Sequence, residues 1–275
     1  MTDPAPRPVR SALFVPASSP RALAKAPGAG ADAVIYDLED AVAPAAKPAA
    51  RDALAGALAT PGPALRIVRV NGLGTPWHED DLQAVRALAP DGVLIPKAEG
   101  PAAVAKARDG TGLPVWAMIE TPSGVLRAPA IAAAEGLAGL VAGTNDLAAE
   151  LRAEGRPAMA LALQGIVLAA RAAGVVALDG VCGAFRDADA LRAECAEGRR
   201  LGFDGKTLIH PVQVAAANAA FGPSDEEVAL ARRRIEAFEA MLAQGAGVAV
   251  LDGRIVENLH VRAARRILAI AGAAG

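Results

Sequence analysis

The chain has 275 residues, of which 53% are hydrophobic, and a formal net charge of −2 at pH 7. This length fits one large α/β domain, or one domain with a small appendage. A nearly balanced charge without a block of Lys and Arg argues against a nucleic-acid partner and against an anionic surface as partner.

The two cysteines, Cys182 and Cys195, show neither the spacing of metal ligands nor that of a disulfide framework. We therefore expect a reduced, cytoplasmic protein. The N-terminal residues contain no apolar signal segment, and no apolar run is long enough to cross a bilayer, so we expect no membrane association.

Short apolar segments rich in β-forming residues alternate with Ala-, Leu- and Arg-rich segments about every 25–35 residues, the size of a βα unit. Most of the apolar segments are continuously hydrophobic, as strands buried on both faces should be. The predicted strands are residues 11–17, 33–39, 65–71, 92–98, 114–121, 139–145, 175–182 and 205–210.

A predicted helix follows each strand, over residues 20–29, 44–58, 77–88, 101–108, 124–134, 157–173, 187–201 and 211–220. Strands that each precede a helix in this way predict a (β/α)8 TIM barrel. An open doubly wound sheet is the alternative, but it usually has a Gly-rich phosphate turn after its first strand, and Pro16-Ala17-Ser18-Ser19-Pro20 is not such a turn. We predict a barrel domain over residues 1–222.

Residues 223–275 depart from the pattern and predict a small C-terminal extension built as helix, hairpin and helix. Ser224 and Glu227 have the spacing of a capping box that opens a helix to about residue 242. Asp252-Gly253 between apolar pairs predicts a β-hairpin, and a last helix is expected over residues 259–271. This extension could pack on its own barrel or on a neighbouring subunit.

Two apolar segments lead into acids, Glu120 and Asp146, separated by one βα unit. In a parallel barrel the ends of strands meet at one rim, so both carboxylates would face one pocket. Two oxygen ligands without a neighbouring Cys or His favour Mg²⁺, which usually takes one or two protein carboxylates plus water and substrate oxygens. For either acid alone, a helix cap is the simpler interpretation.

Other polar residues also follow predicted strands. Glu39 and Asp40 could cap the next helix or serve a site, and Asp37 and Glu39 could point to the same side of their strand. Arg69 interrupts an apolar segment, so it requires a carboxylate or a bound anion; a structural ion pair with Asp37 or Glu39 and a direct substrate contact can coexist. We assign Lys97 as an ion-pair partner rather than a Schiff-base lysine.

The remaining candidates have mainly structural interpretations. We expect His210 to be satisfied beside its Pro turn, and His78 and His260 to lie on helix surfaces. Cys182, Trp77 and Trp116 are expected to serve packing.

Taken in register, several motifs resemble those of the citrate lyase beta-subunit family of CoA-ester lyases, within the HpcH/HpaI aldolase/citrate lyase superfamily. They begin with Arg10-Ser11-Ala12-Leu13-Phe14-Val15-Pro16 and Tyr36-Asp37-Leu38-Glu39-Asp40-Ala41-Val42 and end with Gly205-Lys206-Thr207-Leu208-Ile209-His210-Pro211. Between them lie Arg69-Val70-Asn71, Leu94-Ile95-Pro96-Lys97, Ile119-Glu120-Thr121 and Asp146-Leu147.

The resemblance implies that Glu120 and Asp146 bind Mg²⁺. It implies that Arg69, with Asn71 after it, contacts substrate oxygens, and that Glu39 and Asp40 surround the water shell of the metal. Coenzyme A would lie near Arg10 and near the loop of Ile209, His210 and Pro211. The resemblance also implies a homo-oligomer, often a trimer, in which one subunit's C-terminal extension covers a neighbour's site.

The sequence departs from this family in the C-terminal extension. Gly253-Arg254-Ile255-Val256-Glu257-Asn258-Leu259 stands where the family usually has Gly-x-Met-Ile-Asp-x-Pro, so Glu257 replaces the Asp that is the proposed acid/base. Glu keeps the carboxylate but moves it by one methylene, which matters when a misplacement of about 1 Å can cost ~100-fold in rate.

The first hypothesis for function is a Mg²⁺-dependent lyase that cleaves or forms a malyl-, citramalyl- or citryl-CoA, giving acetyl-CoA or a relative and a 2-keto acid. The second is a CoA-thioester hydrolase on the same site, with Glu257 positioning water. The third, from another class, is a weakly catalytic barrel that binds an acyl-CoA.

Overall fold

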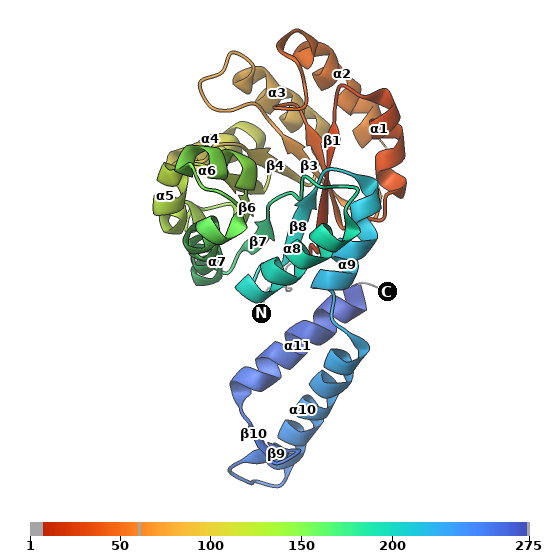
Figure 1. Ribbon diagram of the computed structural model, residues 1–275, viewed down its shortest axis with the longest axis vertical. Helices are drawn as coiled ribbons and strands as arrows, with labels where there is room; N and C mark the ends of the chain where they lie inside the picture. Colours follow the sequence, from red (N-terminus) through yellow and green to blue (C-terminus); the bar gives the residue numbers. More distant parts are fainter. Residues whose placement is uncertain (1–7, 60–61, 274–275) are drawn as a thin grey trace. The chain divides into compact units, whose positions relative to one another are not determined.

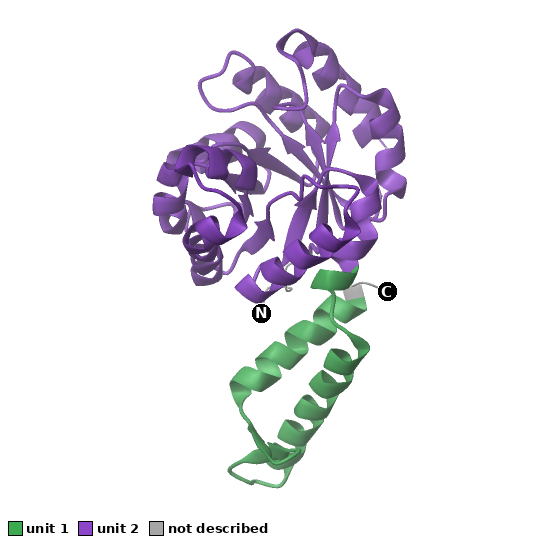
Figure 2. Ribbon diagram, in the orientation of Figure 1, with its two compact units in different colours: residues 1–8, 219–275 green, residues 9–218 purple. Residues whose placement is uncertain are grey.

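The computed structural model describes residues 8–59 and 62–273. They divide into two compact units, a barrel of residues 9–218 and a smaller C-terminal unit of residues 219–273, with which Pro8 is grouped (Figure 2). The contacts thus separate the units slightly before residue 222. No helix in the described residues is long and apolar enough to span a membrane.

The barrel is closed by eight parallel strands in the order of the sequence (Figure 1), as the alternation of apolar and helical segments predicts. The strands are β1 (Ser11–Pro16), β2 (Ala33–Asp37), β3 (Leu65–Arg69), β4 (Gly92–Ile95), β5 (Val115–Ile119), β6 (Leu137–Ala142), β7 (Val176–Asp179) and β8 (Gly205–Leu208). β8 pairs with β1 through Ser11 and Lys206, which closes the ring.

Helices cover the outside of the barrel. They are α1 (Pro20–Lys25), α2 (Lys47–Leu58), α3 (His78–Leu88), α4 (Pro101–Thr111), α5 (Pro122–Ala132), α6 (Thr144–Leu151), α7 (Ala160–Ala173), α8 (Ala188–Leu201) and α9 (Val214–Phe221). Local sequence sets several of their beginnings: Ser19 and Thr121 each accept a backbone N–H as an N-cap, and a Pro follows each of them.

Inward-pointing apolar residues fill the barrel, because successive residues of a strand point to opposite faces. Trp116 is the largest of them, and it packs with Leu178, Val141 and others in one cluster. A Cβ at Gly139 of the neighbouring strand would lie 2.5 Å from the Trp116 ring, so only glycine leaves room for it. The expected packing role of Trp116 is confirmed, and the close-packed interior leaves the strand ends as the place for a site.

The C-terminal unit contains α10 (Asp225–Ala243), the antiparallel pair β9 (Ala249–Leu251) and β10 (Arg254–Val256), and α11 (Asn258–Ala273). The capping box is formed as predicted: Glu227 N–H donates to the Ser224 hydroxyl and Ser224 N–H to the Glu227 carboxylate. Asp252 and Gly253 both have positive φ, 50° and 73°, the conformation that a two-residue hairpin turn requires.

Candidate active site

The carboxyl ends of the strands surround a cavity of about 390 Å³. Residues at the ends of β2 and β3, and residues that follow β2, β5 and β6, supply its charged groups. Residues on or just after β1, β7 and β8 supply apolar and small polar groups. The lining residues are Phe14, Pro16, Asp37, Asp40, Ala41, Arg69, Met118, Glu120, Ala142, Gly143, Thr144, Asn145, Asp146, Val181, Thr207 and Ile209. The expectation that Glu120 and Asp146 face one pocket therefore agrees with the structure, and Arg69 lines the same cavity.

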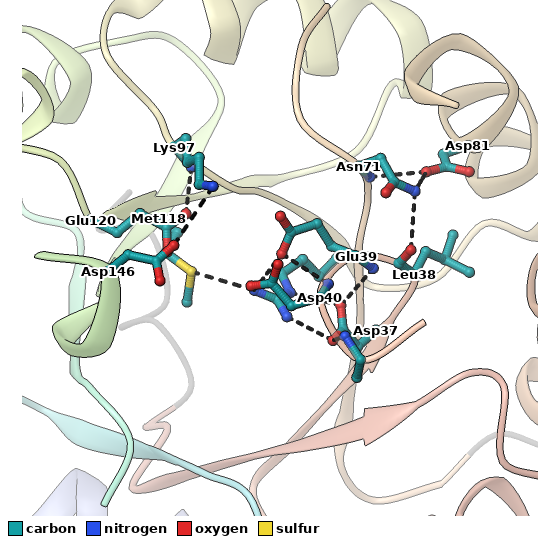
Figure 3. A network of polar contacts seen from close by, with 12 residues as sticks. Asp37, Leu38, Glu39, Asp40, Asn71, Asp81, Lys97, Met118, Glu120 and Asp146 are labelled. Atoms are coloured by element: carbon teal, nitrogen blue, oxygen red, sulfur yellow. Dashed lines mark hydrogen bonds and ion pairs between the residues drawn. The ribbon is translucent and has the colours of Figure 1, made fainter. Parts of the chain in front are cut away.

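Arg69 is buried at the end of β3 and is held by three acids, Asp37, Glu39 and Asp40, which lie close together in Figure 3. Its Nε and Nη2 each donate to a different oxygen of Asp37 at 2.7 Å, and its Nη1 lies 2.8 Å from Glu39 Oε2. Asp40 Oδ2 is 3.4 Å from the same Nη1. Burial alone lowers the pKa of Arg69, but the hydrogen bonds and charges of these acids outweigh it and raise the pKa. The guanidinium is a permanent cation with one edge at the cavity.

Glu39 and Asp40 cap no helix. The residue before α2 is Ala46, and no side chain caps this helix, so the capping interpretation of the two acids is wrong. β2 ends at Asp37, and both acids lie on the turn that follows it. Burial is the largest cause that raises the pKa of Glu39, to about 7, and the charge of Arg69 opposes it.

Glu120 and Asp146 form the second charged group of the cavity lining, and Lys97 lies beside both acids (Figure 3). Glu120 is buried, and its Oε1 accepts the Lys97 backbone N–H at 2.7 Å. Lys97 Nζ lies 3.7 Å from Asp146 Oδ2, so the predicted ion-pair role of Lys97 is confirmed. Burial raises the pKa of Glu120 to about 7, the charge of Asp146 adds to the rise, and the Lys97 N–H bond opposes it.

The sequence placed Asp146 at the end of a strand, and the structure does not. β6 stops at Ala142, and Asp146 lies in the first turn of α6, a short helix that the apolar pattern missed. Thr-Asn-Asp after a glycine was the available signal, because Asp is favoured in the first turn of a helix. The helix carries the carboxylate back over the cavity.

The two carboxylates suit Mg²⁺. Both offer hard oxygens at one cavity, and Mg²⁺ usually takes one or two protein carboxylates and completes its shell with water and substrate oxygens. The Gly143 backbone lies against Glu120, since a Cβ there would fall 2.5 Å from Glu120 Oε2. The chain thus keeps a side chain out of the space beside this oxygen.

Two predicted substrate contacts lie outside the cavity. Arg10 precedes β1, and its Nε and Nη2 bind both oxygens of Asp32. Asn71 is buried, and its Nδ2 donates to Asp81 at 2.6 Å and to Leu38 O at 3.1 Å. Both side chains are occupied by structural partners, so the cavity provides no support for their expected contacts with substrate or CoA.

His78 is a further correction. The sequence placed it on a helix surface, but it is buried, and its Nδ1 lies 2.8 Å from the Asn71 carbonyl oxygen. The acidic residues that follow His78 in the sequence gave no sign of its burial. It is buried because the Thr-Pro-Trp segment folds the first turn of α3 back onto the end of β3.

The loop after β8 reaches the cavity through Ile209, whose side chain is exposed. His210 Nδ1 accepts the Val212 N–H, and its ring stacks on Phe185 with centroids 5.0 Å apart. His210 is thus satisfied beside its Pro turn, as predicted. Pro211 begins the short 3-10 turn of residues 211–213.

Glu257 belongs to the C-terminal unit. It follows β10 with an exposed side chain, and its backbone N–H donates to His260 Nδ1 at 3.0 Å. Its role as acid/base stays a prediction.

Sequence reasoning missed several lining residues. The Phe14 ring lies 4.9 Å from Arg69 Cζ, and Met118 Sδ lies 3.9 Å from Arg69 Nη1. Thr144 and Thr207 add hydroxyl groups. Nothing in the sequence separates Phe14 and Met118 from core residues, since both continue the inward face of an apolar strand.

Comparison with known proteins gives consistent matches over nearly the whole chain. Residues 10–211 match the model of the HpcH/HpaI aldolase/citrate lyase family. A (3S)-malyl-CoA thioesterase of Cereibacter sphaeroides is 52% identical over 97% of this chain and 95% of the relative. Citrate lyase subunit beta of Escherichia coli is 36% identical over 97% and 94%.

Among solved structures, protein CitE from Mycobacterium tuberculosis, in complex with magnesium, acetoacetate and coenzyme A, aligns with a TM-score of 0.81. It is 36% identical, and the alignment covers 96% of this chain and 98% of that one.

Proposed function

The chain belongs to the HpcH/HpaI aldolase/citrate lyase family, and from this premise we propose that it is a Mg²⁺-dependent enzyme that hydrolyses the thioester of (3S)-malyl-CoA or a similar 3-hydroxyacyl-CoA. The observation that carries the choice of reaction is the 52% identity, over 97% of the chain, to a (3S)-malyl-CoA thioesterase. This proposal reverses the order of the sequence hypotheses, which placed the lyase first.

Glu120 and Asp146 would hold the Mg²⁺, which when bound supplies Lewis-acid charge at the substrate's hydroxyl and carboxylate oxygens. Lys97 lies beside both acids: its backbone N–H donates to Glu120, and its ammonium group lies 3.7 Å from Asp146 Oδ2. The short backbone hydrogen bond holds the buried Glu120 carboxylate before substrate arrives, so Glu120 needs little reorganisation on binding.

Arg69 would stabilise the negative charge that grows on the thioester oxygen. Asp37 holds the guanidinium by two hydrogen bonds, which leaves Nη1 toward Glu39, Asp40 and the cavity. A cation fixed in a largely buried site stabilises such charge more strongly than the same cation in water.

A proton acceptor is also required, because the attacking water must lose a proton. Asp40 lines the cavity, and Glu39 lies beside it with its pKa raised to about 7 by burial, a value suited to a general base near neutral pH. We assign this function to the Glu39 and Asp40 pair. Glu257 is the alternative proton acceptor, and a loss of turnover in Glu257→Gln would favour it over the Glu39 and Asp40 pair.

Carbon–carbon cleavage is the second candidate, favoured by the 36% identity to citrate lyase subunit beta. The same groups suit it, because Arg69 would then offset the charge of an enolate, and one of the acids would take the hydroxyl proton.

The deciding experiment combines the protein, Mg²⁺ and (3S)-malyl-CoA in H₂¹⁸O, with citramalyl- and citryl-CoA in parallel. Hydrolysis gives free CoA and malate with one ¹⁸O in the new carboxylate. Cleavage gives acetyl-CoA and glyoxylate and would move the lyase to first place. Turnover of none of the esters would contradict both reactions.

Two expectations remain predictions. A homotrimer, or a multiple of one, would give the matching mass in sedimentation equilibrium. A cytoplasmic location would be tested by cell fractionation.

A further inference from the structure

Lys47 is a buried lysine at the start of α2, outside the cavity lining. Its Nζ donates to two consecutive backbone carbonyls, those of Leu38 and Glu39, at 2.9 Å each. It also lies 5.0 Å from the centroid of the Trp77 ring. The described contacts of this ammonium are thus with neutral groups, two carbonyl oxygens and an aromatic ring, whereas a buried charge normally has a counter-ion.

The two carbonyls belong to the turn that carries Glu39 and Asp40. On the opposite side, the turn's N–H groups point to acids: Glu39 N–H and Ala41 N–H donate to the two oxygens of Asp37 at 2.9 and 3.2 Å. The peptide groups of the turn are therefore oriented, with oxygens toward Lys47 and N–H groups toward the Asp37–Arg69 pair. A fixed cation behind the turn favours this orientation electrostatically.

The structure thus links Lys47 to Arg69 without direct contact. Asp37 receives four donors, two from Arg69 and two from the turn, and the turn also presents Glu39 to Arg69 Nη1. If the turn rotates, both the Asp37 carboxylate that binds Arg69 and the Glu39 carboxylate beside Arg69 move.

We propose that Lys47 is a positioning residue, which fixes the turn of residues 38–41 from behind and thereby holds Arg69 at the cavity with Glu39 beside it. The effect on turnover rests on the proposed function, whereas the effect on the turn does not.

Lys47→Met tests this, since Met keeps most of the side-chain volume and removes the charge. The variant should fold, because each carbonyl keeps another donor: Leu38 O has Asn71 Nδ2, and Glu39 O has the Val42 N–H. We expect hydrogen exchange of the Glu39 and Ala41 amides to become at least ~10-fold faster. We expect kcat to fall about 10- to 100-fold, as for a misplacement of about 1 Å, with KM and Mg²⁺ affinity within about twofold of wild type.

Two further variants separate positioning from a loss of stability. Lys47→Arg keeps a cation and should recover most of the kcat and the amide protection. Leu54→Ala removes a fully buried apolar side chain from the same helix; it should lower the melting temperature with kcat near wild type, measured well below that temperature.

If the Glu39 and Ala41 amides of Lys47→Met exchange hydrogen at the wild-type rate, the proposal is overturned, whatever reaction the enzyme performs. An equal loss of kcat in Leu54→Ala would also overturn it. If the wild type turns over none of the thioesters, the proposed function fails, while the exchange result still decides the role of Lys47.

Discussion

The cavity contains two groups of acids that use their oxygens differently. At the end of β2, Asp37 is buried and accepts four hydrogen bonds, two of them from Arg69. After β5 and β6, Glu120 accepts one backbone N–H, and the contact of Asp146 with Lys97 is 3.7 Å long. The acids of the first group are paired with a cation of the protein itself, Arg69. The second keeps oxygens free, and it is therefore the group that can bind a metal ion from solution.

The largest effect should follow from removing the metal or its buried ligand. EDTA should abolish turnover, and added Mg²⁺ should restore it. Glu120→Gln should lower kcat/KM by at least about 10³-fold, because several kcal/mol of charge stabilisation are lost. Steady-state assays with (3S)-malyl-CoA check this, and full activity of the EDTA-treated protein would remove the metal from the account.

Arg69→Met should affect both catalysis and folding. Loss of the cation should lower kcat by about 10²–10³-fold, and the unpaired, buried Asp37 should cost about 3–5 kcal/mol of unfolding free energy. Urea titration and kinetics measure the two effects. The double variant with Asp37→Asn should recover stability and not activity; recovery of both would show that Arg69 has only a structural role.

Gly143→Ala should have a smaller effect that is confined to the metal site. The added Cβ would lie 2.4 Å from Glu120 Cβ, so the carboxylate must move. We expect Mg²⁺ affinity to fall about 10- to 100-fold, the size of effects on ligand orientation, in a calorimetric titration. Gly183→Ala is the matched control, since a Cβ there meets nothing within 4 Å; equal losses in both variants would contradict the prediction.

The smallest effect concerns the pH dependence of stability. The pKa of Glu39 rises from 4.5 to about 7 on folding, so the folded state holds a proton that the unfolded state has released. The stability that this proton contributes is present below pH 4.5 and is lost as the pH rises through about 7. In metal-free protein, Glu39→Gln should therefore lose less stability over this range than wild type, as measured by urea unfolding. Parallel curves would mean that Glu39 has an ordinary pKa.

The fold was largely predictable, because eight apolar strands and their intervening helices are local patterns. The charged group around Arg69 was also predictable, since a buried Arg must find carboxylates. The roles of Asn71 and His78 were not, because they depend on contacts between the end of β3 and the start of α3: Asn71 donates to Asp81, and His78 Nδ1 lies beside the Asn71 carbonyl oxygen. Likewise, α6 is too short for a clear helical period, so the placement of Asp146 needed the structure.

The most direct test of the division between the two groups is a calorimetric titration of Mg²⁺ into Asp146→Asn and Asp40→Asn. Both aspartates line the cavity with exposed side chains, so the two variants remove similar charge from opposite sides. We predict that Asp146→Asn loses most of the Mg²⁺ affinity, while Asp40→Asn stays within a few-fold of wild type. The reverse result, or equal losses, would contradict the assignment of the metal to the acids after β5 and β6.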